Sequence, residues 1–155
     1  MGSSSVTIRE ALLNVRLVGF DTSPFIYFVE RNPLFAPKIR SVFTVIETQK
    51  MKIVTSAVSV TETLMKPFAD GDNHLAEIYR ELLLRNSIVN TIAVSTDIAE
   101  RAAQLRARYR LKMPDALHIA TAIESGCDAF LTNDTVFKRV DGVRVLILDD
   151  PSLLS

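Results

Sequence analysis

The sequence predicts a three-layer α/β/α sandwich, in which helices cover both faces of a mainly parallel β-sheet. Short apolar runs alternate with amphipathic segments along the chain, and helix-start and helix-stop residues separate them. The chain has 155 residues, 48% of them hydrophobic, which is enough for one core and too few for two. We expect a single domain over residues 16–150, preceded by an extension at 1–15 whose polar start, MGSSS, is typical of expression-derived residues.

The first third of the chain reads as strand, helix, helix, strand. Residues 16–20 form a short apolar run, and the capping residues and proline at 21–24 begin a helix. Asn32 and Pro33 end that helix, and an amphipathic segment at 36–49 predicts the next one. Residues 52–57 then predict the second strand.

The remaining segments continue the alternation. Pro67 and the turn-rich residues 70–73 separate two predicted helices, and Ser95 and Ser125–Gly126 mark the start and end of a later helical pair. The predicted helices are 59–66, 74–85, 97–110, 113–125 and 134–139, and the predicted strands are 87–94, 128–132 and 143–148.

Composition excludes several classes of protein. Eighteen basic residues balance eighteen acidic ones, so net charge neither favours nor excludes a nucleic-acid ligand. The single cysteine, Cys127, is predicted to be a buried structural thiol, and two distant histidines do not make a zinc site. Charged residues interrupt every apolar run before it reaches membrane-spanning length, so we expect a cytoplasmic protein with no membrane contact.

Four acidic residues occupy related places in the predicted fold. Asp21 and Asp134 follow strands, Glu62 lies on the helix after the second strand, and Asp115 lies in the first turn of a helix. Ligands of open parallel sheets bind beyond the carboxyl ends of the strands. We therefore expect the four carboxylates to point into one region.

Helix capping is the competing interpretation for three of these acids, because Asp21, Asp115 and Asp134 all precede or begin helices. Glu62 differs, since it lies among apolar and small residues where an unpaired carboxylate is costly. A divalent cation would compensate that charge, and oxygen ligands suit Mg²⁺ or Mn²⁺. Such an ion activates water and neutralises a phosphodiester during in-line displacement.

Four motifs resemble the PIN-domain family, in particular the VapC-like toxins of prokaryotic toxin–antitoxin pairs. They are residues 18–23 (VGFDTS), 58–62 (VSVTE), 113–122 (MPDALHIATA) and 130–137 (FLTNDTVF). The resemblance spans nearly the whole chain, from about residue 18 to 148, and the order and spacing of the motifs are more specific than any one of them.

The resemblance implies a PIN-like fold and an endoribonuclease that depends on Mg²⁺ or Mn²⁺. It places Asp21, Glu62, Asp115 and Asp134 at the family's acidic positions, as catalytic residues and metal ligands, with Asp134 acting either directly or through water. It also implies an RNA substrate, a small antitoxin partner and a homodimer.

Polar neighbours of the acids are candidates for orienting them. Ser23 and Thr132 are placed to hydrogen-bond nearby carboxylates, and Asn133 does so or serves the local turn. His118 follows Asp115 by three residues. We favour a neutral, hydrogen-bonded packing histidine over a general base, because a metal ion can itself activate water.

A basic run leads into Asp115 and is a candidate for phosphate contacts at the rim of the site. A solvated helix face is the alternative, because charged helix surfaces are common. The residues concerned are Arg106, Arg108, Arg110 and Lys112.

Three other functions compete with nuclease activity. An aspartyl-phosphate phosphatase resembles Asp-x-Asp after its first strand, but Ser23 stands two positions after Asp21. A phospho-receiver needs a lysine near its last strands, where this chain has Asp149 and Asp150. A catalytically inactive PIN fold that binds RNA or a protein partner is the remaining alternative, against which the four acids argue.

Overall fold

A five-stranded parallel sheet forms the centre of the molecule. A computed structural model describes residues 4–155, and all four strand pairings of this sheet are parallel. The strand order is β4-β3-β2-β5-β6. The strands are β2 (Leu17–Phe20), β3 (Lys52–Ser56), β4 (Val89–Ile92), β5 (Ala129–Thr132) and β6 (Arg144–Ile147).

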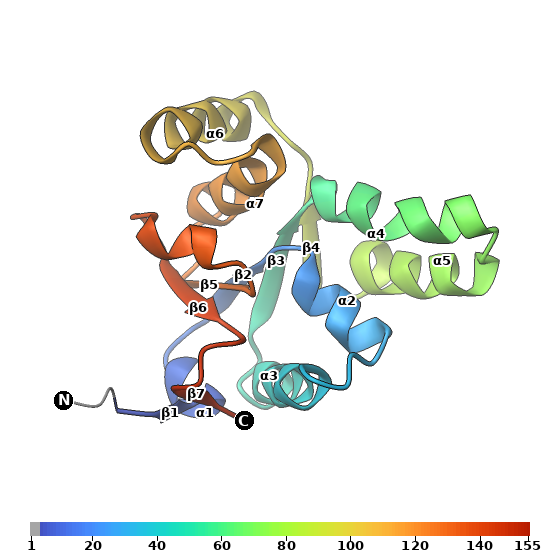
Figure 1. Ribbon diagram of the computed structural model, residues 1–155, viewed down its shortest axis with the longest axis horizontal. Coiled ribbons are helices and arrows are strands. Elements are labelled where there is room, and N and C mark those ends of the chain that lie inside the picture. Colours follow the sequence, from blue (N-terminus) through green and yellow to red (C-terminus); the bar gives the residue numbers. More distant parts are fainter. Residues whose placement is uncertain (1–3) are drawn as a thin grey trace.

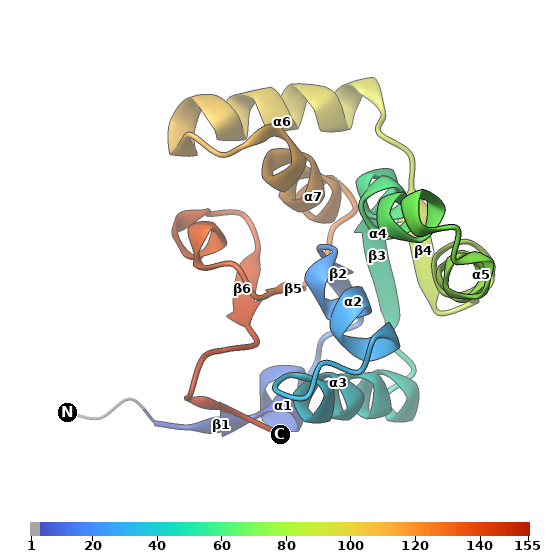
Figure 2. The same cartoon turned by 45° about the vertical axis from the view of Figure 1, so that its right-hand side comes forward.

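Helices cover both faces of the sheet, which confirms the predicted three-layer α/β/α sandwich. Figure 2 shows α6 (Thr96–Tyr109) and α7 (Met113–Glu124) on one side of the sheet, and α1 (Ile8–Ala11) and α3 (Ala36–Thr48) on the other. Neighbouring strand residues alternate between these layers: Ile53 belongs to the core beneath α3, and Val54 to the core beneath α7.

The other helices lie near the ends and edge of the sheet. In Figure 1, α2 (Ser23–Val29) lies beyond the end of β2, while α4 (Ala57–Asp70) and α5 (Asn73–Arg80) form a green hairpin that projects from the sheet. A π-helical turn (Glu81–Arg85) continues α5, and a 3₁₀ turn (Thr135–Arg139) follows β5. Within residues 4–155, no helix is long and apolar enough to cross a membrane.

Pro67 does not end its helix as the sequence suggested, so the predicted end of that helix at residue 66 was wrong. The helix continues to Asp70, and Pro67 itself is buried in its last turns. Gly71 ends it in the left-handed conformation at φ +67, and the Asp72 N–H donates to the Pro67 carbonyl at 2.8 Å. Burial and this cap compensate the hydrogen bond that a proline cannot donate.

The segment before residue 16, which we expected to be an extension, contributes to the core where it is described. Ile8 and Leu12 are 2% exposed and pack in the core layer that contains Ile39. Strand β1 (Val6–Thr7) pairs in parallel with β7 (Leu153–Leu154). The expectation of expression-derived residues at 1–5 falls partly on residues 1–3, which lie outside the described residues.

Candidate active site

The centre of the sheet brings distant parts of the chain together at its carboxyl edge. Strand β2 pairs on one side with β3, the next strand of this sheet along the chain, and on the other side with β5, which comes much later in the sequence. Helix α7 packs closely over β2 at Gly19: a Cβ added to this residue would lie 2.7 Å from the Ala122 Cβ. The missing side chain lets α7 approach the strand and places its first turns beside the residues that follow β2.

Asp21 is the most enclosed of the four acids. Its side chain follows β2, and the residue is 8% exposed. Thr132, at the end of β5, donates its hydroxyl to Asp21 Oδ2, and the Ser23 hydroxyl lies 3.2 Å from Oδ1. Burial raises the pKa of Asp21 from 3.8 to about 6, although the hydrogen bond from Thr132 opposes the rise.

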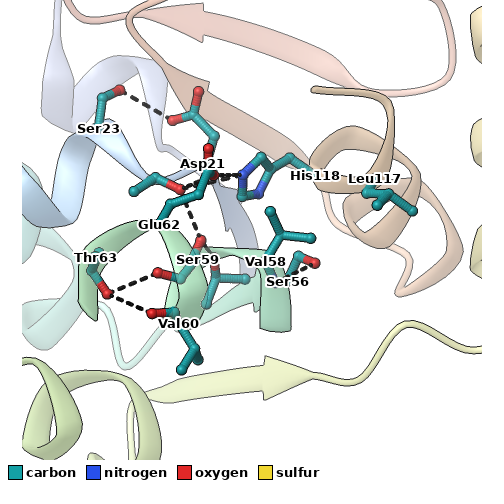
Figure 3. A network of polar contacts seen from close by, with 12 residues as sticks. Asp21, Ser23, Ser56, Val58, Ser59, Val60, Glu62, Thr63, Leu117 and His118 are labelled. Carbon is teal, nitrogen blue, oxygen red and sulfur yellow. Dashed lines mark hydrogen bonds and ion pairs between the residues drawn. The ribbon is translucent and has the colours of Figure 1, made fainter. Parts of the chain in front are cut away.

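Glu62 is better compensated than the sequence suggested. Its Oε1 accepts a hydrogen bond of 2.7 Å from the Thr22 hydroxyl and one of 2.6 Å from His118 Nε2 (Figure 3). The hydrogen bond from His118 is the main reason that the pKa of Glu62 lies below its usual value. The compensation that the sequence called for at Glu62 therefore comes at least in part from protein groups on distant segments.

Asp115 and Asp134 lie on different walls of the site, and the charge of Asp134 acts on Asp115. Asp115 is half-buried in the first turn of α7, and burial followed by the negative charge of Asp134 raises its pKa. Asp134 caps the 3₁₀ turn by accepting a 3.0 Å hydrogen bond from the Val136 N–H. Its own N–H donates at 3.1 Å to the hydroxyl of Thr132, the residue that donates to Asp21.

One cleft of about 520 Å³ contains all four acids. Its walls come from the segments after β2 and β5 and from α4 and α7. The lining residues are Asp21, Thr22, Ser23, Ile26, Tyr27, Glu62, Asp115, His118, Asn133, Asp134 and Thr135. A larger cavity, of about 650 Å³, lies along α3 and has Arg9 and Arg40 but no acidic side chain in its lining. The acidic cleft, and not this larger cavity, is therefore the candidate active site.

The residues expected to orient the acids differ in their contacts. Ser23 and Thr132 both contact Asp21, as their positions suggested. Asn133 lines the cleft but hydrogen-bonds no carboxylate: its amide donates to the Tyr27 hydroxyl at 3.1 Å and accepts the Asp149 N–H at 2.8 Å. Asn133 therefore connects the cleft wall to α2 and to the chain after β6, and these contacts are neither the carboxylate contact nor the local turn contact that we considered.

The basic run does not line the cleft. Arg106 donates to the Leu111 carbonyl at 3.1 Å, and exposed Arg108 lies 3.6 Å from Asp141. Arg110 is exposed beyond the end of α6. The positive charge of Lys112 does act on the site, because it partly offsets the rise in the pKa of Asp115.

His118 and Thr22 both contact Glu62 in the cleft, which the sequence did not reveal. His118 is 3% exposed, as a packing histidine would be, but its partners are Glu62 and, at 3.2 Å, the Thr22 hydroxyl. The one available signal was its position, a single helical turn after Asp115. Spacing alone could not show that α7 faces α4 across the cleft.

The donor set of the cleft fits a hard divalent cation. Within residues 4–155, no three or more His, Cys, Asp or Glu side chains are grouped closely enough to hold an ion as they stand. The carboxylates nevertheless share one cleft, and two of them have a raised pKa because of burial and mutual repulsion. Mg²⁺ and Mn²⁺ favour oxygen ligands, and Mg²⁺ keeps several waters and needs few carboxylates.

Comparisons with known proteins agree with this architecture. Residues 19–143 match the PIN domain family. A toxin–antitoxin complex from Klebsiella pneumoniae has a TM-score of 0.62 and 27% identity, covering 86% of this chain and 98% of that one. VapC20 from Mycobacterium tuberculosis, a sarcin–ricin loop cleaving toxin, has a TM-score of 0.65 and 17% identity, with coverage of 83% and 98%.

A third solved structure shows the same fold. VapBC2 from Rickettsia felis, bound to a DNA fragment from its promoter, has a TM-score of 0.64 and 16% identity, and the match covers 84% of this chain and 98% of that one. No curated protein matches the sequence significantly.

Proposed function

The chain belongs to the PIN-domain family, and from that premise we propose that it is a Mg²⁺- or Mn²⁺-dependent endoribonuclease, the toxin of a toxin–antitoxin pair. The observation that carries the proposal is the shared cleft, in which Asp21, Glu62, Asp115 and Asp134 meet although they are up to 113 positions apart in the sequence. Helix capping accounts for Asp134 but not for this convergence.

The residues of the cleft have two proposed roles: some bind the cation, and others orient its ligands. Asp21, Glu62 and Asp115 would hold the cation, and Asp134 would hold it directly or through water. Thr132 and Ser23 fix the direction of the Asp21 carboxylate, which a metal site requires of the groups around its ligands. When bound, the ion would lower the pKa of an attacking water and neutralise charge on the phosphodiester.

Electrostatics explains why the reaction should depend on metal. An RNA phosphate is anionic, and the cleft presents four acidic side chains. Coulomb repulsion between them would keep the backbone out unless a cation lies between. The arginines of the basic run point elsewhere, so they would guide RNA only from outside the cleft.

An antitoxin partner and a homodimer are part of the same proposal. The matched structures from Klebsiella pneumoniae and Rickettsia felis are toxin–antitoxin complexes, which supports a protein partner for this chain. A toxin that cuts cellular RNA would act in the cytoplasm. Light scattering after size-exclusion chromatography would test the dimer, since a monomeric mass at micromolar concentration would contradict it.

The deciding experiment is incubation of the purified protein with total RNA, with and without Mn²⁺, followed by mapping of new RNA ends. We expect discrete new ends only when metal is present. Asp21→Asn and Asp115→Asn should both abolish cleavage while far-ultraviolet circular dichroism remains unchanged. Cleavage at the wild-type rate by either variant would show that the assigned site is wrong.

The same experiment separates the nuclease from a catalytically inactive RNA-binding relative. RNA that is retained on the protein but stays intact in Mn²⁺ and Mg²⁺ would favour the inactive alternative. Loss of that binding in the presence of EDTA would still show that RNA binding depends on a divalent metal ion.

A further inference from the structure

The two carboxylate oxygens of Glu62 have different surroundings. Oε1 receives both hydrogen bonds, from the Thr22 hydroxyl at 2.7 Å and from His118 Nε2 at 2.6 Å. Oε2 receives none from the described residues, and the Glu62 side chain is 39% exposed in the wall of the cleft. One oxygen is therefore held by the protein while the other is free to bind something in the cleft.

The His118 ring can act only as a donor at this contact. An ionised carboxylate accepts hydrogen bonds but donates none, so the proton between the two groups belongs to Nε2. His118 Nδ1 is buried and has no hydrogen-bond partner among the described residues. The position of the ring thus fixes a donor directed at Oε1.

Thr22 is held in place by a chain of buried hydroxyl groups. The Thr55 hydroxyl donates to the Phe20 carbonyl at 3.0 Å and lies 2.8 Å from the Ser59 hydroxyl. Ser59 in turn lies 3.3 Å from the Thr22 hydroxyl. This chain connects the contact with Glu62 to the backbone of β2, so the second donor on Oε1 is anchored to the sheet.

We propose that His118 is a positioning residue, which together with Thr22 holds Oε1 of Glu62 and leaves Oε2 to ligate the divalent cation. The inference rests on the proposed function, because it assumes a metal ion in the cleft. In this proposal, the contact between His118 on α7 and Glu62 on α4 orients a metal ligand as well as joining the two helices. A purely structural contact would affect folding stability but not the affinity for metal.

The test compares the Mn²⁺ affinity of the wild-type protein and three variants, measured from the electron paramagnetic resonance signal of the free ion. His118→Leu removes the donor, and His118→Gln restores an N–H near the position of Nε2. Thr121→Val is the matched control: Thr121 is also buried in α7, but its hydroxyl donates only to the Leu117 carbonyl of the same helix. Wild-type protein completes the set.

We expect His118→Leu to weaken Mn²⁺ binding about 10- to 100-fold, the usual effect of losing a group that orients a ligand. His118→Gln should recover most of the affinity, and Thr121→Val should bind as the wild type does. Urea denaturation in EDTA would show how far each change alters stability without metal. The rescue by Gln is the result that a merely structural role would not produce.

Two outcomes would overturn the inference in distinguishable ways. Wild-type affinity in His118→Leu, beside wild-type protein that binds Mn²⁺ and cuts RNA, would refute the positioning role and leave the proposed function intact. Wild-type protein that binds no Mn²⁺ would refute the proposed function and the inference with it. If His118→Leu does not fold, Thr22→Val replaces it, because Thr22 is the other donor to Oε1.

Discussion

Asp21 should make the metal-free protein less stable at neutral pH, and Asp21→Asn should therefore stabilise it. The unfolded chain releases this proton near pH 3.8, whereas burial keeps it on the folded protein until about pH 6. Stability is thus unaffected by this group below pH 3.8, falls as the pH rises to 6, and stays reduced above it. Each pH unit of that difference is equivalent to about 1.4 kcal/mol.

The total effect at pH 8 is about 3 kcal/mol of lost stability, from a folded pKa of about 6 against 3.8. Asparagine carries no charge, but its amide disturbs the hydrogen bonds from Thr132 and Ser23, which costs about 1 kcal/mol. Asp21→Asn should therefore be about 2 kcal/mol more stable than wild type at pH 8. At pH 4 the variant should be slightly less stable.

Urea denaturation in EDTA at pH 4, 6 and 8 would measure this difference. Circular dichroism is the suitable signal, because the chain contains no tryptophan. Asp128→Asn is a control of opposite sign, since the Arg16 and Leu17 N–H groups hold the pKa of Asp128 below its usual value. That variant should lose stability relative to wild type as the pH rises. A difference between Asp21→Asn and wild type that does not vary with pH would refute the reasoning.

Three further predictions follow from the cleft and its supporting structure. Millimolar Mn²⁺ should raise the melting temperature of the wild type and raise that of Asp21→Asn less, because an ion that binds only the folded state stabilises it; equal shifts in calorimetry would contradict a site at Asp21. Gly19→Ala should cost about 1 to 3 kcal/mol in urea denaturation, since its Cβ would lie 2.7 Å from that of Ala122; wild-type stability would mean that α7 moves away freely. Ser95→Ala should cost about 1 kcal/mol by removing the hydroxyl that accepts the Ile98 N–H at the start of α6, and an unchanged urea midpoint would argue against that cap.

The sequence predicted the central sheet because buried parallel strands are short, nearly continuous apolar runs. Residues 129–132, which are fully enclosed, are an example. The positions of Asp21 and Asp134 after strands were also sufficient to place both at the carboxyl edge. These features depend on residues that are close together in the sequence.

The remaining features depend on contacts that no local pattern records. Glu62 and His118 are 56 residues apart, and only the packing of α7 across β2 brings them within 2.6 Å. Strands β1 and β7 have two residues each, too few to show any alternation. Pro67 misled the prediction because the cap that stabilises its helix involves Gly71 and Asp72, which read locally as a turn.

The strand order has a consequence for the nascent chain on the ribosome. Strands β2, β3 and β4 can pair as they emerge, but the other edge of β2 stays open until β5 arrives to occupy it. Thr132 arrives with that strand, and Asp134 just after it. The cleft is thus complete only after the segment that follows β5 has been made. A polypeptide interrupted before α7 would carry Asp21 and Glu62 without Asp115 and Asp134, so its acidic cleft would be incomplete.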